Sequence, residues 1–159
     1  MMKETSPDLI KQIEKWYQCW FRLRGAYQGW ADDHGISYNA LFVVREIYRT
    51  PNGCTQKQIC EGIVLSKQTV SSILDKLEKD EIIVRKASEE DRRKKLVCFT
   101  EKGQKYADEL LSQLAKSDIE SYGSVHPKDL QRLIQGGTAL ADAFDKSFYT
   151  LKKSNNKNG

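Results

Sequence analysis

The sequence predicts a mainly α-helical protein with one small β-hairpin, a fold of the α+β class. Three observations lead to this prediction. Prolines occur only at positions 7, 51 and 127, so the long stretches between them are free to form helices. Apolar residues recur at steps of three and four positions over most of the chain, which is the helical period. Near the middle, two short apolar runs flank a charged segment, and this pattern predicts two strands joined by a loop.

Size and composition indicate one globular domain, residues 1–159. Of these residues 39% are hydrophobic and 30% are charged, which is typical of a protein with a heavily charged surface. The net charge of +4 favours polyanionic partners only weakly, because 26 basic residues stand among 22 acidic ones. No segment resembles a secretory signal or approaches the roughly 20 apolar residues that span a bilayer. We therefore expect a cytoplasmic protein with no membrane contact.

Four helices are predicted before the hairpin. Their expected positions are Leu9 to about Asp33, after Ser37 and up to Pro51, Gln56 to about Gly62, and after Ser66 up to Glu81. The hydroxyl groups of Ser37, Thr55 and Ser66 precede the second, third and fourth helices, where they can accept hydrogen bonds from free backbone amides. The fourth helix has one apolar stripe at helical spacing, formed by Val70, Ile73, Leu74 and Leu77.

The hairpin follows the fourth helix directly. Its predicted strands are Ile82–Val84 and Leu96–Phe99, and the charged segment KASEEDRRKK lies between them. Two helices joined by a short turn and followed by such a hairpin form a winged helix-turn-helix, which we place at residues 37–103. Two further helices are expected from Glu101 to about Tyr122 and from Pro127 to Leu151, and segment 152–159 is predicted to be disordered.

The helices of residues 1–36 and 104–151 have more apolar surface than a winged helix of this size can cover. We expect them to be dimerisation helices that pack against the same helices of a second copy. The protein would then be a twofold homodimer that presents its two winged helices to successive turns of one duplex.

The N-terminal half of the fourth helix has the side chains that a helix needs to read the major groove of double-stranded DNA. Gln68 and Ser72 should project away from the buried Val70, and their amide and hydroxyl groups can hydrogen-bond to base edges. The predicted DNA-binding residues of this helix are Ser66, Lys67, Gln68, Thr69, Ser71, Ser72 and Lys76. Lys67, Thr69 and Lys76 are better placed for phosphates. A merely solvated surface is the alternative, but the order of helix, turn, helix and hairpin favours DNA.

The predicted loop of the hairpin is strongly cationic. Arg92, Arg93 and Lys94 would lie at its tip, where they suit the narrow groove of DNA and its flanking phosphates. Asp91 is expected to orient Arg93, because a carboxylate two residues away can hold the guanidinium group in one direction. A solvated run of charges is the alternative, and the acidic pair Glu89 and Glu90 just before the tip supports it, because it partly cancels the local positive field.

Two segments resemble known ones. DRRKKLVCFTEKG, Asp91–Gly103, resembles the D-x-R-x-x-x-x-x-L-T-x-x-G wing signature of the MarR (multiple antibiotic resistance regulator) family, and Leu65–Lys86 is similar to that family's recognition helix and first wing strand. The resemblance implies a homodimeric transcriptional regulator, by default a repressor. It also implies that Arg93 enters the minor groove while the recognition helix reads the major groove.

The resemblance has two departures. Phe99 replaces the leucine of the L-T pair, an apolar exchange that keeps the packing role. Glu81 stands where the family usually has glycine, between the recognition helix and the first strand. Either this turn avoids a positive φ angle, or Glu81 adopts one at the cost of some strain.

The resemblance also implies a signal that releases the DNA, because family members respond to a small ligand or to cysteine oxidation. The predicted pocket for a small aromatic or amphipathic effector consists of Trp16, Trp20, Tyr27, Trp30, Tyr38 and Phe42. Ordinary core and dimer packing is the alternative for each of these residues. Cys19 is the candidate redox residue, because Tyr27 and Tyr38 resemble the tyrosines that accompany the sensing cysteine in the organic-peroxide branch of the family. A buried structural thiol is the alternative, since the sensing cysteine of that branch lies farther upstream, about where Ile13 is.

No other chemistry is predicted. His34 and His126 lie far apart and lack partners at metal-ligand spacing, so we expect no metal site. The sequence has no glycine-rich phosphate loop and no set of nucleophile, base and orienting residue, so we expect neither an enzyme nor a cofactor. A winged-helix protein-interaction module is the alternative function. The polar and basic surface of the fourth helix argues against it.

Overall fold

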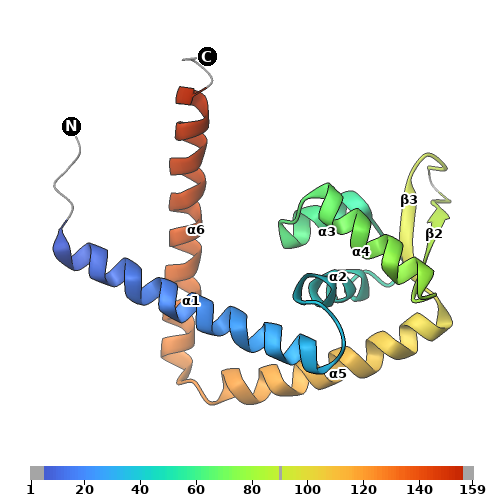
Figure 1. Cartoon of the computed structure of the whole chain (residues 1–159), viewed down its shortest axis with the longest axis horizontal. Helices are drawn as coiled ribbons and strands as arrows, with labels where there is room; N and C mark the ends of the chain where they lie inside the picture. The colour runs from blue at the N-terminus through green and yellow to red at the C-terminus, as the bar shows by residue number, and fades with distance from the viewer. Residues whose placement is uncertain (1–5, 90, 156–159) are drawn as a thin grey trace. The chain divides into compact units, whose positions relative to one another are not determined.

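The computed structural model describes residues 6–89 and 91–155 (Figure 1). The chain forms two compact units, Met1–Leu111 and Ser112–Gly159. In chain order the elements are α1 (Pro7–Asp33), α2 (Tyr38–Tyr48), β1 (Cys54–Thr55), α3 (Gln56–Ile63), α4 (Lys67–Lys79), β2 (Ile83–Ala87), β3 (Lys95–Phe99), α5 (Glu101–Gly123) and α6 (Pro127–Asn155). The predicted fold class, mainly helical with a small antiparallel sheet, is confirmed. None of the described helices has a stretch that is long and apolar enough to cross a membrane.

The helices begin where their capping residues predict. The Ser37 hydroxyl accepts a hydrogen bond from the backbone amide of Ala40 at 3.3 Å. Thr55 and Gln58 form a reciprocal capping box at the start of α3, in which each side chain accepts from the other residue's backbone amide. Each bond satisfies an amide that has no partner within its helix, so the sequence itself determines these starts.

The core of the first unit lies between α2, α3, α4 and the sheet. Its fully buried side chains include Leu41, Val43, Val44, Ile47, Ile59, Val70, Leu74, Ile83 and Val97. The predicted stripe of α4 is largely confirmed, because Val70, Leu74 and Leu77 are buried. Ile73 is only half-buried, since it borders a surface cavity rather than the centre of the core.

The sheet has three strands in the order β1-β3-β2, and both neighbouring pairs are antiparallel. The hairpin pairs Ile83 with Phe99 at its base and Ala87 with Lys95 toward its tip. Strand β1 was not predicted. It has two residues, Cys54 and Thr55, which pair with Val97 and Leu96 of β3. So short a strand has no alternation in its own sequence, and its partner lies far along the chain.

The turn between α4 and β2 decides the alternative that the sequence left open at Glu81. Glu81 has a φ of 59°, so it adopts the left-handed conformation that glycine adopts most easily. Two contacts hold it there. The Thr100 hydroxyl donates to the Glu81 carbonyl oxygen at 2.6 Å, and the Lys102 ammonium lies 3.4 Å from the Glu81 carboxylate.

Gly103 fixes how α5 leaves the sheet. A Cβ atom at this position would lie 1.7 Å from the carbonyl oxygen of Ile82, so only glycine fits without movement of the backbone. The Gly103 amide donates to the Thr100 hydroxyl at 2.9 Å, which caps the new helix. The close approach and the cap explain why threonine and glycine stand three residues apart here.

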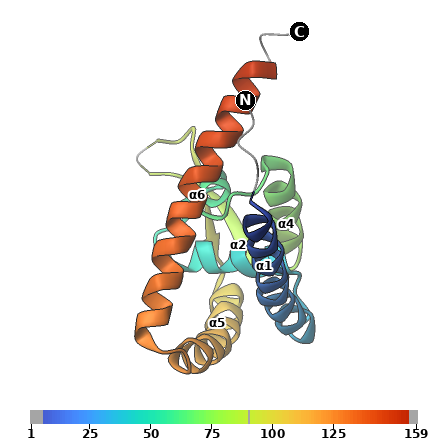
Figure 2. The same cartoon turned by 90° about the vertical axis from the view of Figure 1, so that its left-hand side faces the viewer.

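The second unit contains the end of α5 and the whole of α6, joined by a short turn (Figure 2). In this turn the Ser124 amide donates to the Glu120 carbonyl oxygen at 3.1 Å, and the Asp129 amide donates to the His126 carbonyl oxygen at 2.8 Å. Helix α6 continues to Asn155, so it extends into segment 152–159, for which disorder was predicted. Residues 156–159 of that segment lie outside the described residues.

Candidate nucleic-acid interface

Helix α4 has a buried face and a polar face. Val70 is fully buried, whereas Gln68 and Ser72 are exposed, which agrees with their expected projection away from the core. Lys67 and Lys76 are exposed as well, and Thr69 and Ser71 are half-buried. The polar face therefore combines hydrogen-bonding groups with two cations, the combination that base edges and phosphates require.

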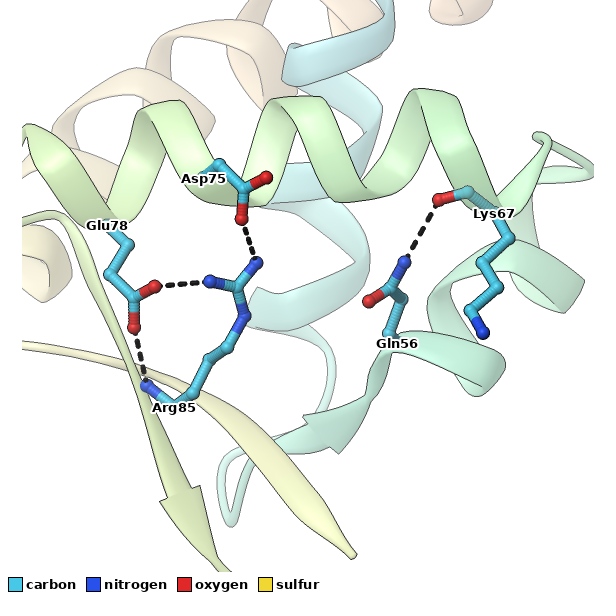
Figure 3. Close-up of polar contacts among 5 residues, drawn as sticks. All are labelled: Gln56, Lys67, Asp75, Glu78 and Arg85. Atoms are coloured by element: carbon cyan, nitrogen blue, oxygen red, sulfur yellow. Dashed lines mark hydrogen bonds and ion pairs between the residues drawn. The ribbon is translucent and has the colours of Figure 1, made fainter.

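The first turn of α4 is fixed by local contacts. The Ser66 hydroxyl accepts from the Thr69 amide at 3.1 Å and shares a second hydrogen bond with the Thr69 hydroxyl at 2.8 Å. The Gln56 amide group, at the start of α3, donates to the Lys67 carbonyl oxygen at 3.0 Å (Figure 3). The bond from Gln56 links α3 to α4, and the bonds between Ser66 and Thr69 fix the conformation of the first turn of α4. This turn is the end of α4 that is expected to enter the major groove of DNA.

The tip of the hairpin presents its cations to solvent. Arg92, Arg93 and Lys94 are exposed, and the Arg93 side chain retains 95% of its accessible surface. The Asp91 carboxylate accepts from the Arg93 backbone amide at 3.1 Å and lies 3.5 Å from the Arg93 Nε atom. Its second oxygen lies 3.9 Å from the Lys94 ammonium. Asp91 thus contacts Arg93 and Lys94.

Arg85 is a charged residue that the sequence reasoning missed. It lies on β2, and its guanidinium group reaches two carboxylates of α4, those of Asp75 and Glu78 (Figure 3). The nitrogen facing Asp75 is 2.7 Å from the carboxylate oxygen. Acidic residues three positions apart lie on one face of a helix, and this spacing was the available signal. Which strand residue would meet them depended on the tertiary fold.

The six aromatic residues of the predicted pocket fall into separate groups. Tyr27, Tyr38 and Phe42 form a cluster in which the Phe42 ring centroid lies 5.7 Å from Tyr27 and 4.9 Å from Tyr38. Trp20 stacks on Phe21 at 5.5 Å, and Trp30 stacks on His34 at 3.7 Å. Trp16 is half-buried on α1. Of these six residues, Tyr38 and Phe42 line a cavity that the structure describes, and a pocket formed by all six stays a prediction.

Two cavities of the first unit are relevant to small molecules. One, of about 260 Å³, includes Tyr38 and Phe42 in its lining. The other, of about 410 Å³, lies between the α1–α2 loop, α4 and α5, and its lining includes Ile36, Ser72, Ile73, Lys76, Leu77 and Tyr106. Burial raises the pKa of Tyr106 above its usual value, and its phenol can donate a hydrogen bond. This second cavity shares Ser72 and Lys76 with the predicted DNA-binding residues.

The cysteines differ in their surroundings. Cys19 is exposed on α1, so within this chain it is not the buried thiol of the structural alternative. Cys54 is buried, and burial raises the pKa of its thiol although a hydrogen bond with Thr50 partly opposes this effect. Among the residues that the structure describes, no three histidine, cysteine, aspartate or glutamate side chains are grouped in a way that could hold a metal ion.

Comparisons with known proteins agree with this geometry. The sequence model of the MarR family matches residues 34–94, from the end of α1 to the tip of the hairpin. The HTH-type transcriptional regulator MhqR of Bacillus subtilis (strain 168) is 31% identical over 98 residues, which cover 55% of this chain and 67% of that protein.

Solved structures extend the similarity beyond the matched segment. A MarR family regulator from Neisseria meningitidis superposes with a TM-score of 0.74 at 28% identity, over 86% of this chain and 96% of that one. CouR from Rhodococcus jostii RHA1, solved with p-coumaroyl-CoA bound, gives a TM-score of 0.69 over 79% of this chain and 87% of its own. At 18% identity, CouR shows similarity of fold only.

Proposed function

This chain belongs to the MarR family of DNA-binding transcriptional regulators, and on that premise we propose that it is a homodimeric repressor whose affinity for DNA falls when a small ligand binds. The observation that supports this proposal most strongly is the arrangement of the first unit. The exposed polar face of α4 and the cationic tip of the hairpin belong to one compact body, in which α4 and β2 are in contact.

The roles of the individual residues follow from their chemistry. Gln68 can pair with adenine through its amide, and Ser72 can donate to or accept from several bases in the major groove. Lys67 and Lys76 would neutralise phosphates on either side. Arg93 would enter the minor groove, where the negative potential is strongest, while Asp91 limits the directions that its guanidinium group can take.

The dimer is proposed from the apolar side chains that α1 exposes. They are Leu9, Ile10, Ile13, Tyr17, Trp20, Phe21 and Leu23, each with more than two fifths of its surface accessible. In the second unit Ile119 and Ile134 are more exposed still. Large apolar side chains exposed in this number along one helix are unfavourable in water and are typical of a protein interface. A second copy of the chain would cover it, and the two copies would present two reading helices to one operator.

Ligand control is proposed from the cavity beside α4. Its lining combines apolar side chains, such as Ile36 and Leu77, with the Lys76 ammonium and the Tyr106 phenol. Such a site suits a small amphipathic effector with an aromatic or aliphatic body and an acidic or polar group. Because Ser72 and Lys76 belong both to this lining and to the predicted DNA-binding residues, an occupant would compete with DNA for the same side chains.

The test is selection of duplexes from a random-sequence pool, followed by fluorescence anisotropy of the selected duplex and a scrambled one at two salt concentrations. We expect tight binding of the selected duplex, a large preference over the scrambled one, and weaker binding at higher salt because lysine and arginine displace counterions from phosphates. Equal weak binding to both duplexes would contradict the proposal. It would point instead to a winged-helix module whose partner is a protein.

A further inference from the structure

The Arg85 side chain joins the two parts of the molecule that would touch DNA. It projects from β2, the first strand of the hairpin, and lies between the carboxylates of Asp75 and Glu78 on α4 (Figure 3). The Arg85 backbone amide also donates to the Glu78 carboxylate, at 3.3 Å. Glu78 therefore contacts both the guanidinium group and the main chain of the same strand residue.

These contacts differ from ordinary surface ion pairs. Pairs such as Lys57–Glu61 and Lys105–Glu101 join residues one turn apart in a single helix, and side chains of this kind remain largely exposed. The Arg85 side chain retains only 22% of its accessible surface, and its planar group contacts two carboxylates at once. Low exposure and several hydrogen bonds from one guanidinium fix both distance and orientation.

The contacts between Arg85 and Glu78 span the turn between α4 and β2, so they can restrict the angle between these two elements. The chain turns from α4 into β2 at Glu81, a non-glycine residue at a φ of 59°. Arg85 and Glu78 lie on opposite sides of this turn, so their ion pair closes a short loop across it. Rotation at the turn would change the angle between α4 and the hairpin, and with it the separation between Gln68 and Arg93.

From this geometry we infer that Arg85 is a positioning residue for DNA binding. It clamps the recognition helix to the wing, so that α4 enters the major groove and Arg93 the minor groove of the same duplex. The inference rests on the proposed function, because it requires that both elements bind DNA. It predicts that loss of Arg85 removes the contribution of Arg93 as well.

A double-mutant cycle tests this coupling with the duplex selected by the wild-type protein. Arg85→Gln, Arg93→Ala and the double variant are compared by fluorescence anisotropy, and thermal unfolding shows whether each variant is folded. We expect Arg85→Gln to weaken binding roughly tenfold, and the double variant to bind within about threefold of Arg93→Ala alone. Losses that multiply would overturn the inference, because they would mean that the two residues act independently.

A second variant separates the clamp from simple electrostatics. Glu78→Ala removes a negative charge from the recognition helix, so if Glu78 were only a surface charge, its loss would strengthen binding to a polyanion. If Glu78 holds Arg85, binding weakens instead, by a factor of about three to ten. This variant tests the inference even if Arg85→Gln does not fold, because alanine is favourable in a helix. Tighter binding by Glu78→Ala would overturn the clamp.

Arg49→Gln is the matched control, because it makes the same substitution with the same loss of charge. Arg49 pairs with Glu46 at 3.5 Å within the end of α2 and does not join two elements through that pair. We expect a change in affinity below about threefold. Wild-type protein that prefers no duplex would refute the proposed function and this inference together. Wild-type binding that Arg85→Gln leaves unchanged would refute the inference alone.

Discussion

Arg93 is the residue through which the wing would contact DNA, and it combines near-complete exposure with a contact to Asp91. We predict that Arg93→Ala weakens binding to the selected duplex by about 1–3 kcal/mol, because a guanidinium group inserted in a groove is lost. Fluorescence anisotropy measures the loss, and circular dichroism shows that the variant is folded. Unchanged affinity in a folded variant would exclude the wing from the mechanism.

Val64 occupies a strained position in the turn between α3 and α4. It has a φ of 53° and a ψ of 44°, which is a strained conformation for a β-branched residue. The residue is 89% exposed, so burial of its side chain does little to offset this strain. We predict that Val64→Gly raises the free energy of unfolding by about 1 kcal/mol, measured by urea denaturation.

Gly35 provides the matched control for Val64. It has a φ of +69°, and a Cβ atom there would meet no heavy atom within 4 Å, so Gly35→Ala adds strain without a clash. This variant should be less stable than the wild type by about 1 kcal/mol. If both substitutions changed stability in the same direction, backbone strain would not be the cause.

Cys54 should be the less reactive thiol of the pair Cys19 and Cys54. Burial raises the pKa of Cys54, so less thiolate is present at any pH below that value, and the side chain is shielded as well. We predict that iodoacetamide modifies Cys19 before Cys54, and that the rate at Cys54 rises with pH up to its raised pKa. Mass spectrometry of digested protein at successive times measures both rates. Equal rates in the folded protein would contradict this reading.

At the scale of an element, the junction between the sheet and α5 depends on the absence of a side chain at Gly103. A Cβ atom would overlap the Ile82 carbonyl oxygen, which belongs to the backbone and cannot rotate away. We predict that Gly103→Ala lowers the free energy of unfolding by about 1–3 kcal/mol, measured by urea denaturation. Lys105→Ala, two residues along the same helix and exposed, should change it by less than about 0.5 kcal/mol.

Elements that depend on local chemistry were predictable from the sequence. The hydroxyl caps at Ser37, Thr55 and Ser66 and the period of α4 act within a few residues, so their signal lies in adjacent positions. The exposure of Gln68 and Ser72 followed from the same period. Strand β1 was not predictable, because its two residues are a strand only through pairing with β3.

The parts of the candidate site that the sequence did not reveal depend on distant partners. Arg85 could be recognised as a helix–strand link only once β2 was seen to pack against α4. Which aromatic rings come together also depends on the tertiary fold: Tyr27 of α1 meets Phe42 of α2, whereas Trp20 and Trp30 stack on Phe21 and His34 near them in the sequence. The residue spacing within a single segment predicts neither the Arg85 ion pairs nor the grouping of the aromatic rings.

At the scale of the whole molecule, the exposed apolar surface predicts the assembly state. Phe21, with 57% of its surface accessible, is the clearest case on α1. We predict that sedimentation equilibrium at micromolar concentration gives twice the chain mass of 18.3 kDa for the wild type, and that the Trp20→Ser and Phe21→Ser double variant dissociates at least tenfold more readily. The Val64→Gly variant is the control, because it removes an exposed apolar side chain outside the proposed interface. A monomeric wild type would rule out the dimer.

Strand β3 is bordered on both sides, by β1 before α3 and by β2 after α4. The base of the hairpin is thus part of the same sheet that supports the helix-turn-helix. Toward the tip, the Ser88 backbone amide donates a hydrogen bond of 2.9 Å to the Lys94 carbonyl oxygen, and this bond closes the loop at its base. A segment closed at its own base can change in length or charge while the supporting strands stay in register. Relatives could therefore differ in the sequence of this tip, and so in the DNA sequence that they prefer, while the three-stranded sheet and the helix-turn-helix stay the same.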